Sequence, residues 1–251
     1  SSQYQFDLPV APQITAEEIS QIREIEARFE NEVNLPLEIT PARFRKLKER
    51  FDSYQITATD SGITGKSIWF IRYSEVFQKL DVEWQGFYVK HQKEVQAYSE
   101  LMYELARGYR SCPDPRWRDE LKQMFLLMVR HLFDQGWQEG SGMGTLHHLG
   151  YGLRNYYPAL FLMRAELGEA GLAVPAQKAM EWFSGVGEVK KAPEISGISI
   201  DAFNTSVMGR LASILMLPDS PEKVTWLRSF SRYIDNGLQL ADGLEDSFKA
   251  D

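Results

Sequence analysis

The residues best suited to chemistry are gathered in one stretch, from Thr145 to Pro158. Two of the four histidines in the chain stand side by side there, at His147 and His148. A neutral imidazole accepts a proton near pH 7, which makes the pair a candidate general base. Adjacent histidines do not have the spacing of zinc ligands, and no Cys partner accompanies them, so no metal site is predicted. The structural alternative is that both rings pack into a crevice at a helix end.

Aromatic and basic side chains surround the histidine pair. Trp137, Tyr151, Tyr156 and Tyr157 are candidate platforms for sugar rings, because the apolar face of a sugar stacks on an aromatic ring. Core packing is the open alternative for each of these rings. Arg154 is suited to hold a carboxylate or a sulfate with two hydrogen bonds, or equally to brace the loop.

Composition and charge exclude several classes of protein. Hydrophobic residues make up 43% of the 251 residues, which is enough for a sizeable core. The net charge of −7 argues against a nucleic-acid partner, and a polyanionic substrate would require local clustering of Arg and Lys. A single cysteine rules out an internal disulfide, and no apolar run is long enough to predict a membrane partner. The start at Ser1 suggests a processed or excised piece.

Capping patterns mark the first helices. Thr15 and Glu18 have the spacing of a capping box, and Thr40 before Pro41 combines a cap residue with proline at the first helical position. Each start is followed by an apolar stripe at helical spacing, formed by Ile19, Ile22, Ile25 and Phe29 in the first helix and by Phe44, Leu47 and Phe51 in the second.

The rest of the chain also has mainly helical patterns. Two long helices are predicted over 86–110 and 116–135, separated by a stop at residues 112–115. Residues 53–70 are expected to be loops, with a short strand at 67–71, and residues 140–154 are expected to be a loop because they hold five glycines. Further helices are predicted over 157–167, 175–183, 201–217 and 221–240.

Helices that occur in pairs with short connections predict a mainly α fold of antiparallel helical hairpins, in a solenoid or an α/α toroid. No sequence repeat of fixed period is present, which disfavours TPR-type or HEAT-type arrays. Residues 1–13 are expected to link to a preceding domain, and residues 14–251 to form one helical region.

Several runs resemble the chondroitin sulfate ABC lyases of polysaccharide lyase family 8. The likeness extends from about Phe6 to the end of the chain, and its most specific block is the histidine pair followed by Gly150, Tyr151 and Arg154. The other runs that carry the resemblance are residues 121–128, 131–136, 202–205 and 230–234.

The resemblance implies an incomplete α/α toroid, of which this chain would be the first part. The chain would stop before the motif that holds the main catalytic His and Tyr, so this piece alone is expected to be inactive. The implied reaction is β-elimination at the uronic acid of chondroitin sulfate and dermatan sulfate, giving 4,5-unsaturated products. His148 is implied as the base for dermatan, with His147 beside it, and Asn204 as the residue that holds the substrate carboxylate. For Asn204, a role in satisfying backbone groups near a helix start is equally open.

The same resemblance carries expectations about the whole protein. It implies a bacterial enzyme that is periplasmic or secreted and is a monomer, with a sulfated glycosaminoglycan as its partner. No cofactor is expected to be essential, although a divalent cation, Ca²⁺ or Mg²⁺, is expected to assist with dermatan.

Two other functions are open from the sequence. One is a noncatalytic carbohydrate-binding segment. The other is a glycoside hydrolase on an α/α toroid, which needs two opposed carboxylates. Residues 136–158 supply only Glu139, which counts against the hydrolase.

Overall fold

The computed structural model describes residues 13–66, 82–134, 147–168, 171–172 and 200–231. Within these ranges, only the backbone is described for residues 82–93, 95, 133–134, 147–154 and 200–207. The predicted strand at 67–71, the predicted helix at 175–183, Trp137 and Glu139 lie outside the described residues.

The described part of the chain is mainly α, as predicted. Its helices are α1 (Ala16–Val33), α2 (Pro41–Asp52), α4 (Val82–Ser111), α5 (Pro115–Asp134), α6 (His147–Leu162) and α9 (Ile200–Leu215), and its strands are β1 (Thr57–Thr59) and β2 (Gly62–Thr64). Residues 164–168 and 221–231 are also helical. No described helix has the length and the apolar character needed to cross a membrane.

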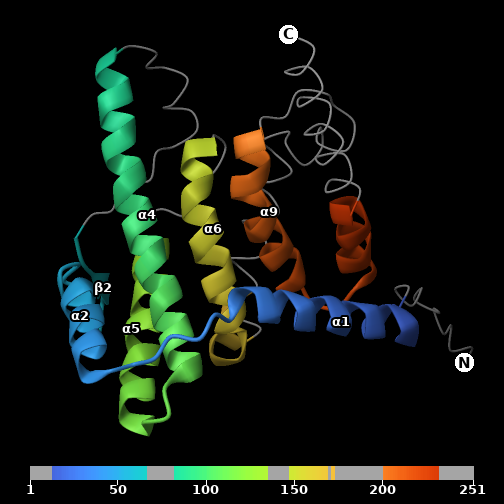
Figure 1. Cartoon of the computed structure of the whole chain (residues 1–251), viewed down its shortest axis with the longest axis horizontal. Helices are drawn as coiled ribbons and strands as arrows, with labels where there is room; N and C mark the ends of the chain where they lie inside the picture. The colour runs from blue at the N-terminus through green and yellow to red at the C-terminus, as the bar shows by residue number, and fades with distance from the viewer. Residues whose placement is uncertain (1–12, 67–81, 135–146, 169–170, 173–199, 232–251) are drawn as a thin grey trace, which may run out of the picture.

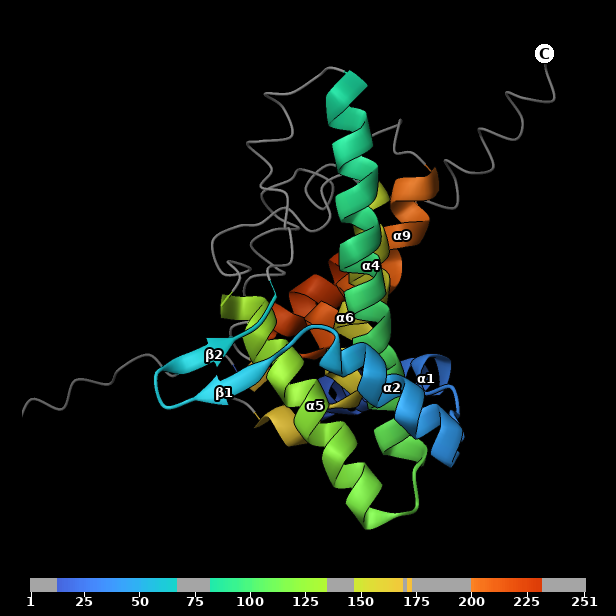
Figure 2. The same ribbon diagram turned by 90° about the vertical axis from the view of Figure 1, so that its left-hand side faces the viewer.

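The helices α4, α6 and α9 lie side by side and run in the same direction (Figure 1). Their N-terminal ends are therefore at one end of the bundle, at the top of Figure 1. α5 runs back along α4 as an antiparallel hairpin, which confirms one of the predicted helical hairpins (Figure 2). α1 crosses the opposite end, where it contacts α6 and α9. The incomplete α/α toroid implied by the resemblance remains a prediction.

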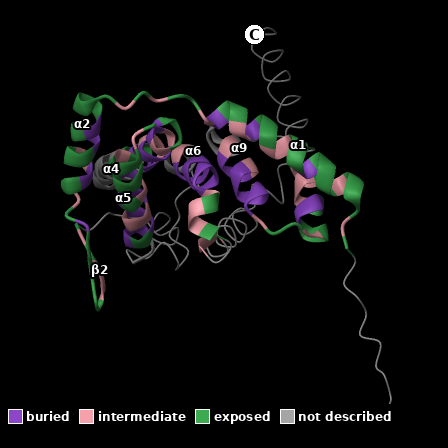
Figure 3. Cartoon of the chain, turned by 90° about the horizontal axis from the view of Figure 1, so that it is seen from below, coloured by how far each residue is buried: buried purple, intermediate pink, exposed green. Residues whose placement is uncertain are grey.

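The core lies where α4, α5, α6 and α9 face one another, and the outward faces of α1 and α2 are exposed (Figure 3). The apolar stripes predicted for the first two helices are largely confirmed, because most of their members are buried: Ile22, Phe29, Phe44, Leu47 and Phe51. Ile25 is partly buried, and Ile19 is 38% exposed. The two long helices bury similar stripes, formed by Tyr98, Leu101, Leu105, Leu121, Met124, Phe125, Met128 and Leu132.

Local hydrogen bonds explain where α1 and α2 begin. The Thr15 side chain accepts a hydrogen bond from the Glu18 amide at 3.1 Å, and the Glu18 carboxylate accepts one from the Thr15 amide at 3.0 Å. The Thr40 hydroxyl accepts a bond from the Arg43 amide at 3.1 Å, with Pro41 at the first helical position. Both predicted caps are confirmed, because each satisfies donors that a helix start leaves open.

Residues 53–66 differ from the prediction of loops. β1 and β2 form an antiparallel hairpin in which Thr57 pairs with Thr64 and Thr59 with Gly62. Three-residue strands are too short to show the alternation that identifies a strand in a sequence, so the pairing could not be predicted.

The prediction of a loop over 140–154 is wrong for residues 147–154, because α6 begins at His147. Gly150, Gly152 and Pro158 all disfavour a helix interior. The packing of α6 against α4 and α9 outweighs these local preferences. The helix predicted over 201–217 is α9, which spans Ile200–Leu215.

Candidate functional site

The sequence-predicted residues gather on two neighbouring helices. His147 and His148 open α6, and Tyr151 and Arg154 follow within its first two turns. Asn204 is the fifth residue of α9, which packs along α6 in the same direction. The fold therefore brings the histidine pair and Asn204 to the same end of the bundle. The side chains of these five residues lie outside the described part, so their contacts stay predictions.

α4, α6 and α9 all begin toward this end of the bundle, and α4 begins well beyond the other two (Figure 1). The peptide dipoles of a helix give its N-terminal end a partial positive charge, which favours anions. α4, α6 and α9 all point their N-terminal ends the same way (Figure 1). The helix dipoles therefore provide a local electrostatic preference for an acidic ligand in a chain whose net charge is −7.

Tyr156 and Tyr157 are buried in the core. Both side chains are 0% exposed, and their rings contact each other edge to face at 4.8 Å between centroids. Burial raises the pKa of both phenols far above the usual value. A ring with no exposed face cannot stack on a sugar, so the prediction of sugar platforms is wrong here and core packing holds.

Pro158 interrupts the hydrogen bonding of α6. Proline has no backbone N–H, so position 158 donates nothing to the carbonyl of residue 154, and such breaks bend helices. The turns that carry the histidine pair lie on one side of this break. On the other side, residues 159–163 are all buried in the core. The buried Tyr156 and Tyr157 lie between residue 154 and Pro158, in the turn that lacks this hydrogen bond.

A buried polar cluster joins α4 to α5 near these tyrosines. His131 is 0% exposed, and its Nδ1 lies 3.2 Å from the Tyr98 hydroxyl. Tyr98 donates its only hydroxyl proton to the Met128 carbonyl at 2.6 Å. Nδ1 of His131 therefore carries a proton and donates it to the Tyr98 oxygen. The sequence did not indicate this contact, because Tyr98 and His131 are 33 residues apart in the chain.

The other face of His131 meets the hairpin. A Cβ at Gly65 would lie 2.6 Å from Nε2 of His131, so only glycine fits against the ring at the end of β2. The aromatic ring of Tyr54 meets that of Tyr98 edge to face at 4.9 Å. Burial, and then the phenols of Tyr156 and Tyr54, raise the pKa of Tyr98 well above its usual value.

The opposite end of the bundle holds charged residues that satisfy helix carbonyls. Lys223 is only 2% exposed, and its Nζ lies 2.8 Å from the Leu215 carbonyl, 3.2 Å from Asp219 and 3.4 Å from Glu26. Arg110 likewise donates to the Leu162 carbonyl at 3.1 Å. Cations stabilise these C-terminal ends, where backbone carbonyls have no partner within the helix.

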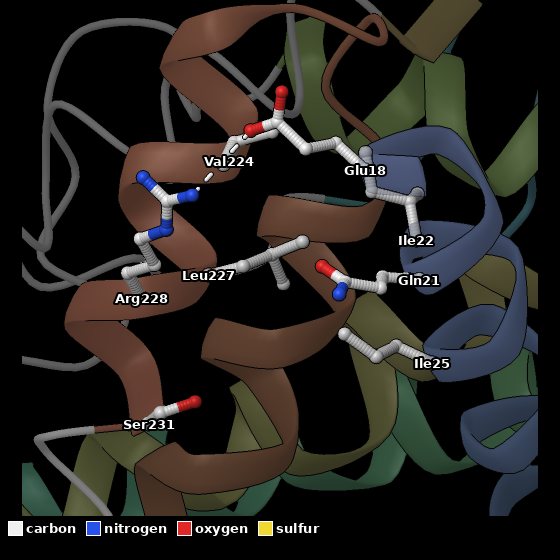
Figure 4. Close-up of a pocket in the computed structure, with 8 residues that line it drawn as sticks. All are labelled: Glu18, Gln21, Ile22, Ile25, Val224, Leu227, Arg228 and Ser231. Atoms are coloured by element: carbon white, nitrogen blue, oxygen red, sulfur yellow. Dashed lines mark hydrogen bonds and ion pairs between the residues drawn. The ribbon is translucent and has the colours of Figure 1, made fainter. Parts of the chain in front are cut away.

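Two pockets lined by described residues also lie beside α1. The smaller, about 160 Å³, has an apolar floor that includes Ile22 and Leu227, and the Glu18–Arg228 ion pair crosses it at 3.5 Å (Figure 4). The larger, about 340 Å³, lies beside Lys223 and Arg164. The smaller pocket lies between α1 and the helix at 221–231, and the larger lies at the C-terminal ends of α6 and α9, so neither is lined by the histidine pair.

Among the residues that the structure describes, no three His, Cys, Asp or Glu side chains form a group that could hold a metal ion. The divalent cation expected from the sequence therefore has no ligand set to which it can be assigned here.

Comparisons with known proteins agree on one family. The family model described as "Lyase, catalytic" matches residues 8–251. A chondroitin sulfate ABC exolyase of Bacteroides thetaiotaomicron is 36% identical over 98% of this chain and 24% of its own length. A chondroitin sulfate ABC endolyase of Proteus vulgaris is 32% identical over 96% of this chain and 25% of its own length. The chain thus spans about a quarter of these curated relatives.

Proposed function

Because the chain belongs to the lyase catalytic-domain family, we propose that it is the helical part of a lyase that cleaves sulfated glycosaminoglycans. The relatives that it resembles over nearly its whole length are chondroitin sulfate ABC lyases. The proposed substrates are chondroitin sulfate and dermatan sulfate, cut by β-elimination at the uronic acid. Each cut leaves a 4,5-unsaturated sugar.

The reaction has two chemical requirements. The proton on C5 of the uronic acid is only weakly acidic, because the neighbouring carboxylate resists further negative charge. The enzyme must therefore hydrogen-bond or neutralise that carboxylate as charge develops. It must also supply a base on the face of the C5 proton and an acid near the leaving oxygen.

Cleavage of both substrates requires catalytic groups on both faces of the uronic acid ring. Glucuronate and iduronate are epimers at C5, so their protons point to opposite sides of the ring. A lyase that cuts both needs a base on each side. We propose that His148 is the base for iduronate in dermatan, with His147 as its neighbour, and that Asn204 holds the substrate carboxylate. Arg154, Tyr151 and Trp137 are proposed contacts for the sugar chain.

The observation that carries this proposal is the parallel packing of α6 and α9. It brings the backbone of the histidine pair and that of Asn204 to the same end of the bundle. The N-terminal ends of α6 and α9 at that position favour a polyanion. A base and a carboxylate-binding group on neighbouring helix starts are the arrangement that the elimination needs.

We further propose that the protein is bacterial, acts in the periplasm or outside the cell, and works as a monomer without a nucleic-acid partner. The experiment that tests the function is an absorbance assay for unsaturated uronate with the full-length protein. Rates with chondroitin sulfate and with dermatan sulfate are compared with the rate in buffer that contains no glycan. Product from both glycans supports the proposal, and no product from either overturns it.

A further inference from the structure

We propose that His131, a residue outside the histidine pair, is a positioning residue that fixes the direction of the first turns of α6 through Tyr98 and Tyr156. The inference rests on the proposed function for its consequence in catalysis. The geometry on which it stands does not depend on that function.

The first step is the fixed state of the ring. His131 donates from Nδ1 to Tyr98, whose own proton is held by the Met128 carbonyl. Nε2 faces the backbone of Gly65 so closely that no Cβ could be accommodated. The imidazole thus joins the hairpin, α4 and α5 in one orientation and has no room to turn.

The second step is the path to α6. Tyr98 is 1% exposed and comes from α4, which packs along α6. Tyr98 and Tyr156 belong to the same cluster of buried core residues. Tyr156 is two residues before Pro158, at the point where α6 lacks a hydrogen bond to residue 154. Tyr98 therefore shares a buried core with the turn of α6 in which a backbone hydrogen bond is missing.

The packing around Pro158 affects the position of the histidine pair. Where a helix bends at proline, its direction depends on side-chain packing around the break. A shift of about 1 Å in a catalytic group can lower a rate about a hundredfold. Loss of the His131 hydrogen bond should therefore loosen the first turns of α6 and reduce turnover of dermatan more than turnover of chondroitin.

The test uses the full-length protein with His131→Leu, His131→Asn and Tyr98→Phe. Asparagine places an amide N–H close to the position of Nδ1–H and so keeps the donor to Tyr98, whereas leucine removes it. Amide hydrogen exchange of the segment 147–156 is measured at a temperature where circular dichroism shows every variant folded. Leu105→Ala, which removes a buried side chain elsewhere on α4, is the control for general destabilisation.

We expect His131→Leu and Tyr98→Phe to speed exchange in 147–156 and to lower kcat on dermatan about tenfold or more with little change in KM. His131→Asn and Leu105→Ala should leave exchange in that segment close to that of the unmutated protein. Unchanged exchange in His131→Leu, or an equal increase in Leu105→Ala, overturns the inference. Exchange is measured without substrate, so this result is distinct from a failure of the lyase proposal, which is the absence of unsaturated product from the unmutated protein.

Discussion

The Nζ of Lys223 lies 2.8 Å from the carbonyl oxygen of Leu215, so a buried ammonium group donates a hydrogen bond to the last residue of α9. The substitution Lys223→Met keeps most of the apolar volume and removes this donor. We expect the free energy of unfolding to fall by about 2 kcal/mol, because the carbonyl and two carboxylates lose a charged partner. Urea unfolding followed by circular dichroism measures the change.

Lys48→Met is the matched control. Lys48 is 54% exposed and lies 3.8 Å from Glu120, so solvent screens its ion pair. The expected change in the free energy of unfolding is within about 0.5 kcal/mol. Equal losses in both variants would contradict the assignment of a structural role to the buried ammonium.

The lowered pKa of Asp219 predicts that the free energy of unfolding depends on pH. Burial alone would raise the pKa of this carboxyl, but hydrogen bonds from Arg23 and Lys223 and their positive charges outweigh burial and lower it. A lowered folded-state pKa adds stability that is present above the unfolded-state value of about 4 and is lost as pH falls further. The stability difference between the unmutated protein and Asp219→Asn should therefore shrink below about pH 4. Urea midpoints from neutral to acidic pH measure it, and a constant difference would refute the prediction.

Gly65→Ala should destabilise the contact between the hairpin and α5. The added Cβ would lie 2.6 Å from Nε2 of His131, a ring that is fully buried. We expect a loss of about 1–3 kcal/mol, the usual cost of overpacking. The exposed neighbour Lys66 provides the control, because Lys66→Ala removes a solvated side chain and should have little effect. Thermal unfolding distinguishes the two variants.

His148→Ala should remove activity selectively. If His148 is the base for iduronate, turnover of dermatan sulfate falls about a hundredfold or more, while chondroitin sulfate is still cut. His147→Ala should have the smaller effect, and Asn204→Ala should reduce activity on both glycans, since both carry the carboxylate. Initial rates of unsaturated uronate formation measure all three variants. An equal loss on both substrates for His148→Ala would show that the pair is structural.

A chelator tests the expected assistance by a divalent cation. We expect EDTA to lower the rate on dermatan sulfate, with recovery on addition of Ca²⁺ or Mg²⁺, and to leave the rate on chondroitin sulfate nearly unchanged. Equal rates on dermatan before and after chelation would mean that no cation assists.

The sequence alone determined the starts of α1 and α2, their apolar stripes and the family. A cap such as Thr15 with Glu18 depends only on residues within one turn, and the stripe through Phe44, Leu47 and Phe51 depends only on helical spacing. Such features can be predicted because all of the interacting groups are close in the chain.

Only the tertiary structure decided where α6 begins, that Tyr156 and Tyr157 are buried, and that Lys223 closes α9. Two glycines and a proline argue locally against α6, and packing against α4 and α9 outweighs them. Burial depends on which distant segments meet, and a single sequence does not specify that. For the same reason, the histidine pair and Asn204, more than 50 residues apart in the chain, come to one end only because two helices pack in parallel.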